Sequence, residues 1–120
     1  MAFKFENLKV WQKALDFSYE IHLLTRKFPK EELYVLVSQS KRAADSIALN
    51  IAEGSTGQTN KEFARFLGIA IRSALELVAC LHLARKRNLI DETEFHQHYD
   101  KATEIVKVTQ ALRNSVLNSL

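Results

Sequence analysis

Apolar residues recur at alternating steps of three and four along most of this chain, and this spacing constrains the fold more than any other feature. An α-helix turns once in about 3.6 residues, so this spacing places the side chains on one helical face, whereas a half-buried strand would alternate every second residue. The longest stripe comprises Phe63, Leu67, Ala70, Ala74, Leu77, Leu81 and Ala84. The pattern therefore predicts long amphipathic helices.

Few residues in the chain favour turns, and their positions divide the pattern into segments. Three glycines and one proline in 120 residues suit long helices with short connections, not a β-rich fold. Pro29 disfavours helical geometry in the residue before it and can open the second helix. Gly54 is a natural C′ residue to end that helix. We predict one domain, 1–120, with helices at about 8–26, 30–53, 60–87 and 91–118.

Two pairs of residues have the spacing of capping boxes, in which each side chain bonds the backbone N–H of the other residue. Thr59 with Glu62 marks the start of the third helix, and Asp91 with Glu94 marks the start of the fourth. Short connections make successive helices antiparallel. The predicted fold is therefore all-α, an antiparallel up-down-up-down four-helix bundle.

The 60–87 helix is apolar beyond its main stripe. A hydrophobic arc wider than one bundle seam indicates burial against a second partner, so we expect the bundle to assemble into a homo-oligomer. The alternative is that this helix is simply the central element of a monomer. The additional apolar residues are Phe66, Ile69, Ile71, Leu75, Val78 and Leu83.

A row of polar side chains runs beside the apolar stripe of the 30–53 helix. If the second and third helices form a hairpin around residues 56 and 57, residues whose numbers add to about 113 lie level. Ser46 then faces Leu67, and Asn50 faces Phe63. The polar row consists of Gln39, Arg42, Ser46, Asn50 and Glu53.

Glu76 lies about one turn beyond the level of Arg42, within reach of a long guanidinium side chain. A buried Arg42–Glu76 pair, supported by Gln39 and Ser73, would satisfy polar groups that are otherwise costly to bury. Such pairs add little net stability but can fix the register of two helices. We interpret the row as a structural polar seam, in preference to a reaction centre.

Basic residues gather at one end of the predicted bundle, where the first and third helices both end. The net charge of +3 permits contact with nucleic acid without requiring it. Cations at helix C-termini also favour the helix dipole, and several acidic residues share this end. The candidate nucleic-acid contacts are Arg26, Lys27, Lys30, Arg85, Lys86 and Arg87.

No arrangement of residues indicates a catalytic, metal or cofactor site. A di-iron bundle needs a glutamate three residues before a histidine, and none of the four histidines has one. The pairs Glu92–His96 and Glu94–His98 are read as solvated pairs on a helix surface. Cys80 lies among apolar residues and is expected to be a buried, inert thiol. We therefore expect a protein that is not an enzyme.

The sequence also favours a cytoplasmic location. A single cysteine excludes an internal disulfide framework, and the N-terminus lacks the apolar core of a signal peptide. No charge-free apolar run approaches the roughly 18 residues that cross a membrane. No membrane association is expected.

Three stretches resemble a known family: "FENLKVWQKA", "FPKEELYVLVSQSKRAADSIALNIAEGS" and "KEFARFLGIAIRSALEL". They are similar to the four-helix proteins encoded by intervening sequences of bacterial large-subunit ribosomal RNA genes. That group includes the accessory variability protein of diversity-generating retroelements, a barrel-shaped pentamer that binds nucleic acid and a reverse transcriptase. The resemblance implies a four-helix bundle, a pentameric ring and no known catalytic activity.

Two positions depart from the family pattern. The loop carries Thr56-Gly57-Gln58 where a Gly-Arg pair is usual, and Arg72-Ser73 replaces a common Gly-Ser pair. Losing the loop arginine weakens any grip of this loop on phosphate. Our function hypothesis is an oligomeric, non-enzymatic scaffold that binds RNA or DNA and a protein partner; the alternative is a purely protein-binding module.

Overall fold

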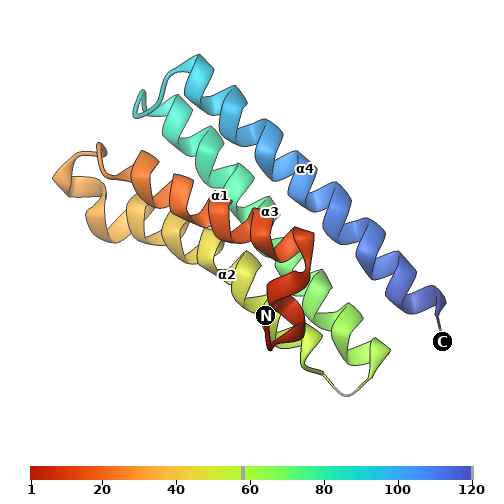
Figure 1. Cartoon of the computed structure of the whole chain (residues 1–120). Helices are drawn as coiled ribbons and strands as arrows, with labels where there is room; N and C mark the ends of the chain where they lie inside the picture. The colour runs from red at the N-terminus through yellow and green to blue at the C-terminus, as the bar shows by residue number, and fades with distance from the viewer. Residues whose placement is uncertain (58, 120) are drawn as a thin grey trace.

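The computed structural model describes residues 1–57 and 59–119, so Gln58 of the predicted loop lies outside the described residues. Four long helices run alternately up and down along a rod with extents of 47 × 23 × 21 Å (Figure 1). The predicted all-α four-helix bundle is confirmed. The helices are α1 (Lys9–Thr25), α2 (Ser38–Ser55), α3 (Asn60–Lys86) and α4 (Glu92–Asn118).

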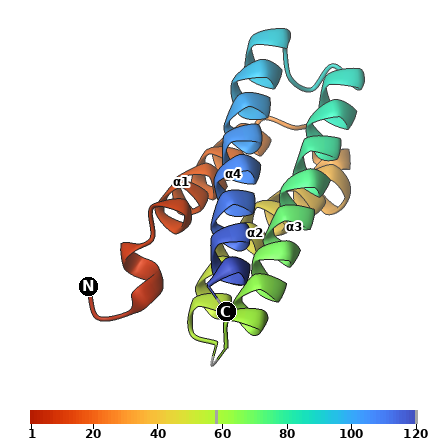
Figure 2. The ribbon, with the colours of Figure 1, turned by 90° about the vertical axis from the view of Figure 1, so that its right-hand side faces the viewer.

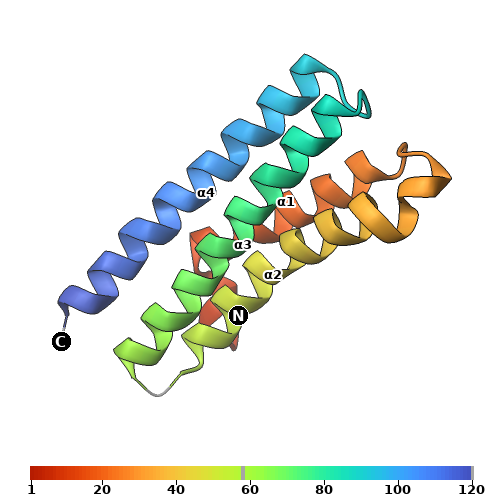
Figure 3. The ribbon, with the colours of Figure 1, turned by 180° about the vertical axis from the view of Figure 1, so that it is seen from behind.

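The four helices do not pack equally. Helix α3 contacts both α2 and α4 extensively, whereas α1 packs mainly on α2 and touches α4 far less. Figure 2 shows the N-terminal end of α1 leaning away from α4, and a short 3-10 helix, η1 (Lys4–Asn7), packs on α2. Helices α1 and α3 lie on opposite sides of the bundle, as the view from behind shows (Figure 3).

The core follows the stripe that the sequence predicts. Every residue of the apolar stripe predicted on α3, from Phe63 to Ala84, is buried, and Leu67 and Leu77 are completely so. They meet Phe17 and Ile21 of α1 and Ile51 of α2 in one continuous cluster. Burying a side chain of this size contributes about 1.5–3 kcal/mol. The apolar stripes therefore account for both the packing and much of the stability.

The chain enters α2 irregularly. The predicted helix over 30–53 is helical from Lys30, but it begins with a 3-10 turn, η2 (Lys30–Glu32), and a π-helical turn, η3 (Leu33–Val37). Pro29 is not helical, with φ −63° and ψ 158°. The wide π turn buries Leu36 and leaves Tyr34 almost fully exposed. Regular α-helix starts only at Ser38.

The predicted end of the second helix at Glu53 is wrong. Helix α2 continues to Ser55, and Gly54 is a buried helical residue, not the C′ residue. The hydroxyls of Ser55 and Thr56 donate to the carbonyl oxygens of Ala52 and Glu53, at 2.8 and 2.7 Å. Side chains thus satisfy terminal carbonyls that a glycine cap would otherwise satisfy.

The other helix ends agree more closely with prediction. Asp91 and Glu94 form both hydrogen bonds of the capping box, and Thr59 Oγ1 accepts from the Glu62 N–H at 3.0 Å. Helix α3 ends at Lys86, and Asn88, just beyond the helix end, has a left-handed φ of 59°. Asparagine tolerates this conformation, which produces the tight turn into α4.

Helix α3 is long and apolar enough to cross a membrane when judged by length and composition alone, even though Arg72 and Glu76 interrupt it. The central helix of a bundle meets the same criterion. Within the bundle, 39% of its most apolar 18-residue stretch is buried. Apolar surface therefore remains on this helix after the monomer has folded.

Candidate functional site

The polar seam joins α2 to α3 through neutral groups. Ser46 Oγ lies 2.8 Å from Ser73 Oγ, and Asn50 Nδ2 donates to Ser46 Oγ at 2.9 Å and to Ser46 O at 2.8 Å. Ser73 is buried, and the other two residues are half-buried. The predicted facing of Ser46 and Leu67 is wrong, because the numbers of the level pair add to 119, not to 113. The hairpin turns later than residues 56 and 57.

The predicted buried Arg42–Glu76 pair is also wrong. Both side chains reach solvent, and Gln39 stands between them: Gln39 Nε2 donates to the Glu76 carboxylate, and Arg42 Nη2 donates to Gln39 Oε1 at 3.3 Å. Glu53, at the other end of the row, lies in the last turn of α2. Within the row, Gln39, Ser46 and Asn50 are half-buried, whereas Arg42 and Glu53 are exposed. The charged side chains of the row, Arg42 and Glu53, extend from the same face of α2.

Acidic residues neutralise part of the basic end of the bundle. Arg87 pairs with Glu32 at 3.0 Å, and Lys27 pairs with Glu94. Arg85 lies 3.4 Å from Glu92, and its guanidinium carbon lies 3.6 Å from the centre of the Phe95 ring. Lys27 also lowers the pKa of Glu94 by its hydrogen bond. Three of the six predicted nucleic-acid contacts therefore already have acidic partners.

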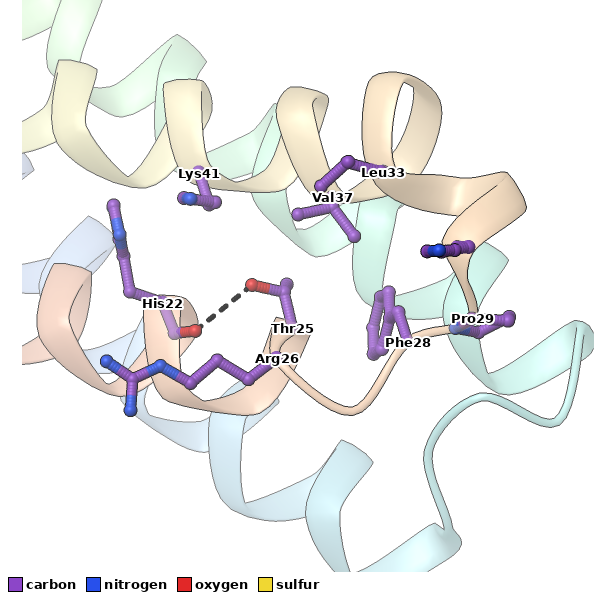
Figure 4. A pocket seen from close by; sticks show the side chains of 9 residues that line it. His22, Thr25, Arg26, Phe28, Pro29, Leu33, Val37 and Lys41 are labelled. Carbon is purple, nitrogen blue, oxygen red and sulfur yellow. Dashed lines mark hydrogen bonds between the residues drawn. The ribbon is translucent and has the colours of Figure 1, made fainter.

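The remaining cations of this end fall into two groups. Lys86 is exposed on α3. Arg26 and Lys30 line a cavity of about 360 Å³ between the end of α1 and the start of α2, together with Lys41 and His22 (Figure 4). The rest of the lining is Thr25, Phe28, Pro29, Leu33 and Val37. We call this cavity the basic pocket.

Sequence reasoning missed Lys41 and His22 as members of this pocket. Counting residues from the predicted break at Phe28-Pro29 would not have found them, because level pairs would then add to about 57, whereas Ser18 and Asp45 add to 63. Asp45 of α2 accepts from Ser18 at 2.5 Å and lies 3.0 Å from His22 Nε2. This register brings Lys41, one turn from Asp45, opposite the end of α1.

Metal-ligating residues do not cluster within residues 1–57 and 59–119: no group of three or more His, Cys, Asp or Glu is found there. His96 pairs with Glu92 at 3.4 Å on the surface as expected. The reading of His98 as a solvated surface residue is wrong, because His98 is buried and its Nδ1 lies 2.7 Å from the Glu94 carbonyl oxygen. Cys80 is buried, and burial raises the pKa of its thiol.

Apolar side chains also emerge on the outside of the bundle. Leu15, Tyr19 and Leu23 repeat every four residues along α1 and are 48%, 63% and 40% exposed. We call these three residues the α1 stripe. Leu75 and Leu83 of α3 are 55% and 46% exposed, and we call them the α3 patch. Because α1 and α3 lie on opposite sides of the bundle, these two surfaces face in different directions (Figures 1 and 3).

Comparison with known proteins decides the family. A model of the 23S rRNA-intervening sequence protein family matches residues 6–111. The chain belongs to this family. The crystal structure of a protein of unknown function from the S23 ribosomal protein family of Bacteroides thetaiotaomicron VPI-5482 is similar, with a TM-score of 0.81. The two chains share 26% identity over 88% of this chain and 95% of that one. No curated protein matches the chain.

The polar seam of this intervening-sequence protein can be tested by double-mutant cycles. We expect Ser46→Ala and Ser73→Ala to be coupled by about 0.5–1.5 kcal/mol, because each hydroxyl is the other's partner. Arg42→Met and Glu76→Gln should instead be coupled by less than about 0.5 kcal/mol, since both side chains are exposed and are joined only through Gln39. Urea unfolding followed by circular dichroism measures both cycles. A larger coupling in the Arg42–Glu76 cycle would contradict the observed geometry.

Proposed function

We propose that this protein is a non-enzymatic scaffold that assembles into a ring of identical subunits. The observation that carries the proposal is the pair of apolar surfaces on opposite sides of one bundle: the α1 stripe and the α3 patch. A symmetric dimer uses the same surface on both subunits, whereas a closed ring needs two different surfaces on each subunit. Two separated surfaces therefore favour the ring.

The helix composition supports the same proposal. Helix α3 remains largely unburied over its most apolar stretch, and contiguous exposed apolar surface on a folded protein marks an interaction site. The residues that the sequence singled out on α3 divide accordingly. Phe66, Ile69, Ile71 and Val78 are half-buried within the bundle, and the α3 patch is left outside. The number five comes from the resemblance to the pentameric retroelement protein.

The proposal predicts that Tyr19→Lys and Leu75→Lys each prevent ring closure. Each variant loses one surface and keeps the other, so mixing the two should give a one-to-one complex of just two chains. Light scattering should show the unaltered protein at about five times the 13.8 kDa chain mass. It should show each variant alone near the mass of one chain.

The mixing step separates a ring from other assemblies. If the subunits formed symmetric dimers, a variant with an intact dimer surface would stay dimeric alone, and mixing would add nothing. An unaltered protein that remains at the mass of one chain at every concentration would refute the proposal. Lys41→Gln, on α2, changes a charge outside both surfaces and should not change the mass.

Nucleic-acid binding is a second candidate activity of the same scaffold. Arg26, Lys30 and Lys86 make no ion pair within the described part of the chain, and a ring would repeat them around its rim. A shift of labelled RNA or DNA that weakens as salt rises would support this activity. The alternative, a purely protein-binding module, predicts no shift at low salt and a partner that still co-purifies after nuclease treatment.

A further inference from the structure

The basic pocket combines an unbalanced charge with a half-open cavity. Its nine lining residues include Arg26, Lys30, Lys41 and His22 but no acidic residue. Within residues 1–57 and 59–119, none of the three Arg and Lys side chains makes an ion pair or a side-chain hydrogen bond. Asp45, on the next turn of α2, is already held by Ser18 and His22.

Helix dipoles do not explain this charge. A cation at the C-terminal end of α1, such as Arg26, interacts favourably with the dipole of that helix. Lys30 stands at the start of the second helical segment, where the dipole is unfavourable for a cation, and Lys41 lies within the body of α2. Like charges around one cavity repel each other unless an anion lies between them. The arrangement thus favours an anionic ligand.

Four of the lining side chains are apolar and form part of the pocket wall. Phe28 is half-buried and Val37 is buried. Pro29 and Leu33 are the other two apolar residues (Figure 4). Aromatic side chains of this kind stack on flat rings. A volume of about 360 Å³ lies at the lower end of the range for small-ligand sites, which suits one small organic anion.

We propose that the basic pocket binds a nucleotide through its terminal phosphate, either as a free nucleotide or as the phosphorylated end of a strand. A phosphate monoester carries nearly two negative charges and three acceptor oxygens, which match three cationic donors better than a single carboxylate does. The aromatic base lies against Phe28 and Pro29. This site does not require the ring, so the two can fail separately, but it shares Arg26 and Lys30 with the proposed nucleic-acid contact.

Titrations of the full-length protein with adenosine 5′-monophosphate, adenosine and inorganic phosphate test the proposal. We expect the monophosphate to shift the backbone amide signals of Thr25, Phe28 and Lys41. Adenosine and phosphate should each bind at least roughly tenfold more weakly, since adenosine lacks the phosphate group and inorganic phosphate lacks the aromatic base. Equal binding of adenosine, or no shift with any of the three and none with the strands below, would overturn the proposal.

Two short strands that differ only in a 5′-phosphate distinguish the sources of the ligand. If the phosphorylated strand shifts these amides and the free nucleotide does not, the ligand is a strand end. If the free nucleotide shifts them, it is the ligand itself. In both cases the unphosphorylated strand should leave the pocket signals unchanged, and a strand that binds equally well without its phosphate would contradict the inference.

A pair of charge variants tests whether the pocket itself is responsible. Replacing its three cations, Arg26→Gln, Lys30→Gln and Lys41→Gln, should weaken binding by roughly tenfold or more. The control Lys27→Gln, Lys86→Gln and Arg87→Gln removes the same charge from the same end of the bundle, outside the pocket. Circular dichroism confirms that both variants fold. If both triple variants lose the same affinity, binding depends on the general positive charge of this end of the bundle, and the proposed pocket is refuted.

Discussion

Replacing Gly54 with alanine should destabilise the protein, even though alanine is the better helix former. A Cβ atom at this position would lie 2.6 Å from Phe66 Cβ and 3.1 Å from Phe63 Cδ1. Because Phe66 Cβ is attached directly to the backbone of α3, it cannot move aside unless α2 and α3 separate. Such overpacking costs about 1–3 kcal/mol, or more when backbone must move. This cost exceeds the roughly 1 kcal/mol that alanine gains over glycine within a helix.

Gly68 provides the matched control on the facing helix. A Cβ atom there would meet only Arg113 Nε, at an ordinary distance of 3.5 Å. Gly68→Ala should therefore stabilise the protein by up to about 1 kcal/mol through helix propensity alone. Urea unfolding at matched protein concentrations measures both variants. Stabilisation by both substitutions would show that α2 and α3 can part at Gly54 at little cost.

Leu77→Ala should strongly destabilise the folded chain, whereas Leu75→Ala should leave its stability almost unchanged. Leu77 is fully buried, whereas Leu75 on the same helix is 55% exposed. Truncating a buried leucine costs about 2–5 kcal/mol, since the cavity that remains is only partly refilled. An exposed truncation normally changes stability by less than about 0.5 kcal/mol. Thermal and urea unfolding of the two variants, measured under conditions where the chain is monomeric, give the comparison.

The same pair separates folding from assembly. If the α3 patch joins subunits, Leu75→Ala should raise the protein concentration at which the assembly dissociates, although the monomer remains as stable as before. Sedimentation at several concentrations measures that shift. A Leu75 variant that assembles normally would remove this leucine from the interface and leave only Leu83 of the α3 patch as a contact for the α1 stripe.

The four helices and their core could be predicted because each depends on local spacing. Every residue of the α3 stripe is buried as predicted, and the Asp91–Glu94 capping box is complete. The role of Gly54 could not be predicted from local spacing alone. A glycine near a helix end signals either a cap or a close approach of two helices, and only the packing of α3 distinguishes the two.

The candidate site was harder to predict, since it depends on the rotation of each helix and on the exact register of the hairpins. An error of a few residues in the α2–α3 turn placed Leu67, not Ser73, opposite Ser46. Long side chains add further freedom, so Arg42 bonds Gln39 on its own helix and not Glu76. The choice of acidic partner for each cation is likewise a property of the packed bundle.

The unequal packing of the helices bears on how the chain folds during synthesis. Nearly all of the packing joins helices that follow each other in the sequence: α1 with α2, α2 with α3, and α3 with α4. Contacts between neighbours in sequence form rapidly, because little loop entropy is lost in closing them. Each newly made helix can dock on its predecessor as it leaves the ribosome. The contact between the first and last helices, α1 with α4, is far smaller, so no early helix must wait exposed for a late partner.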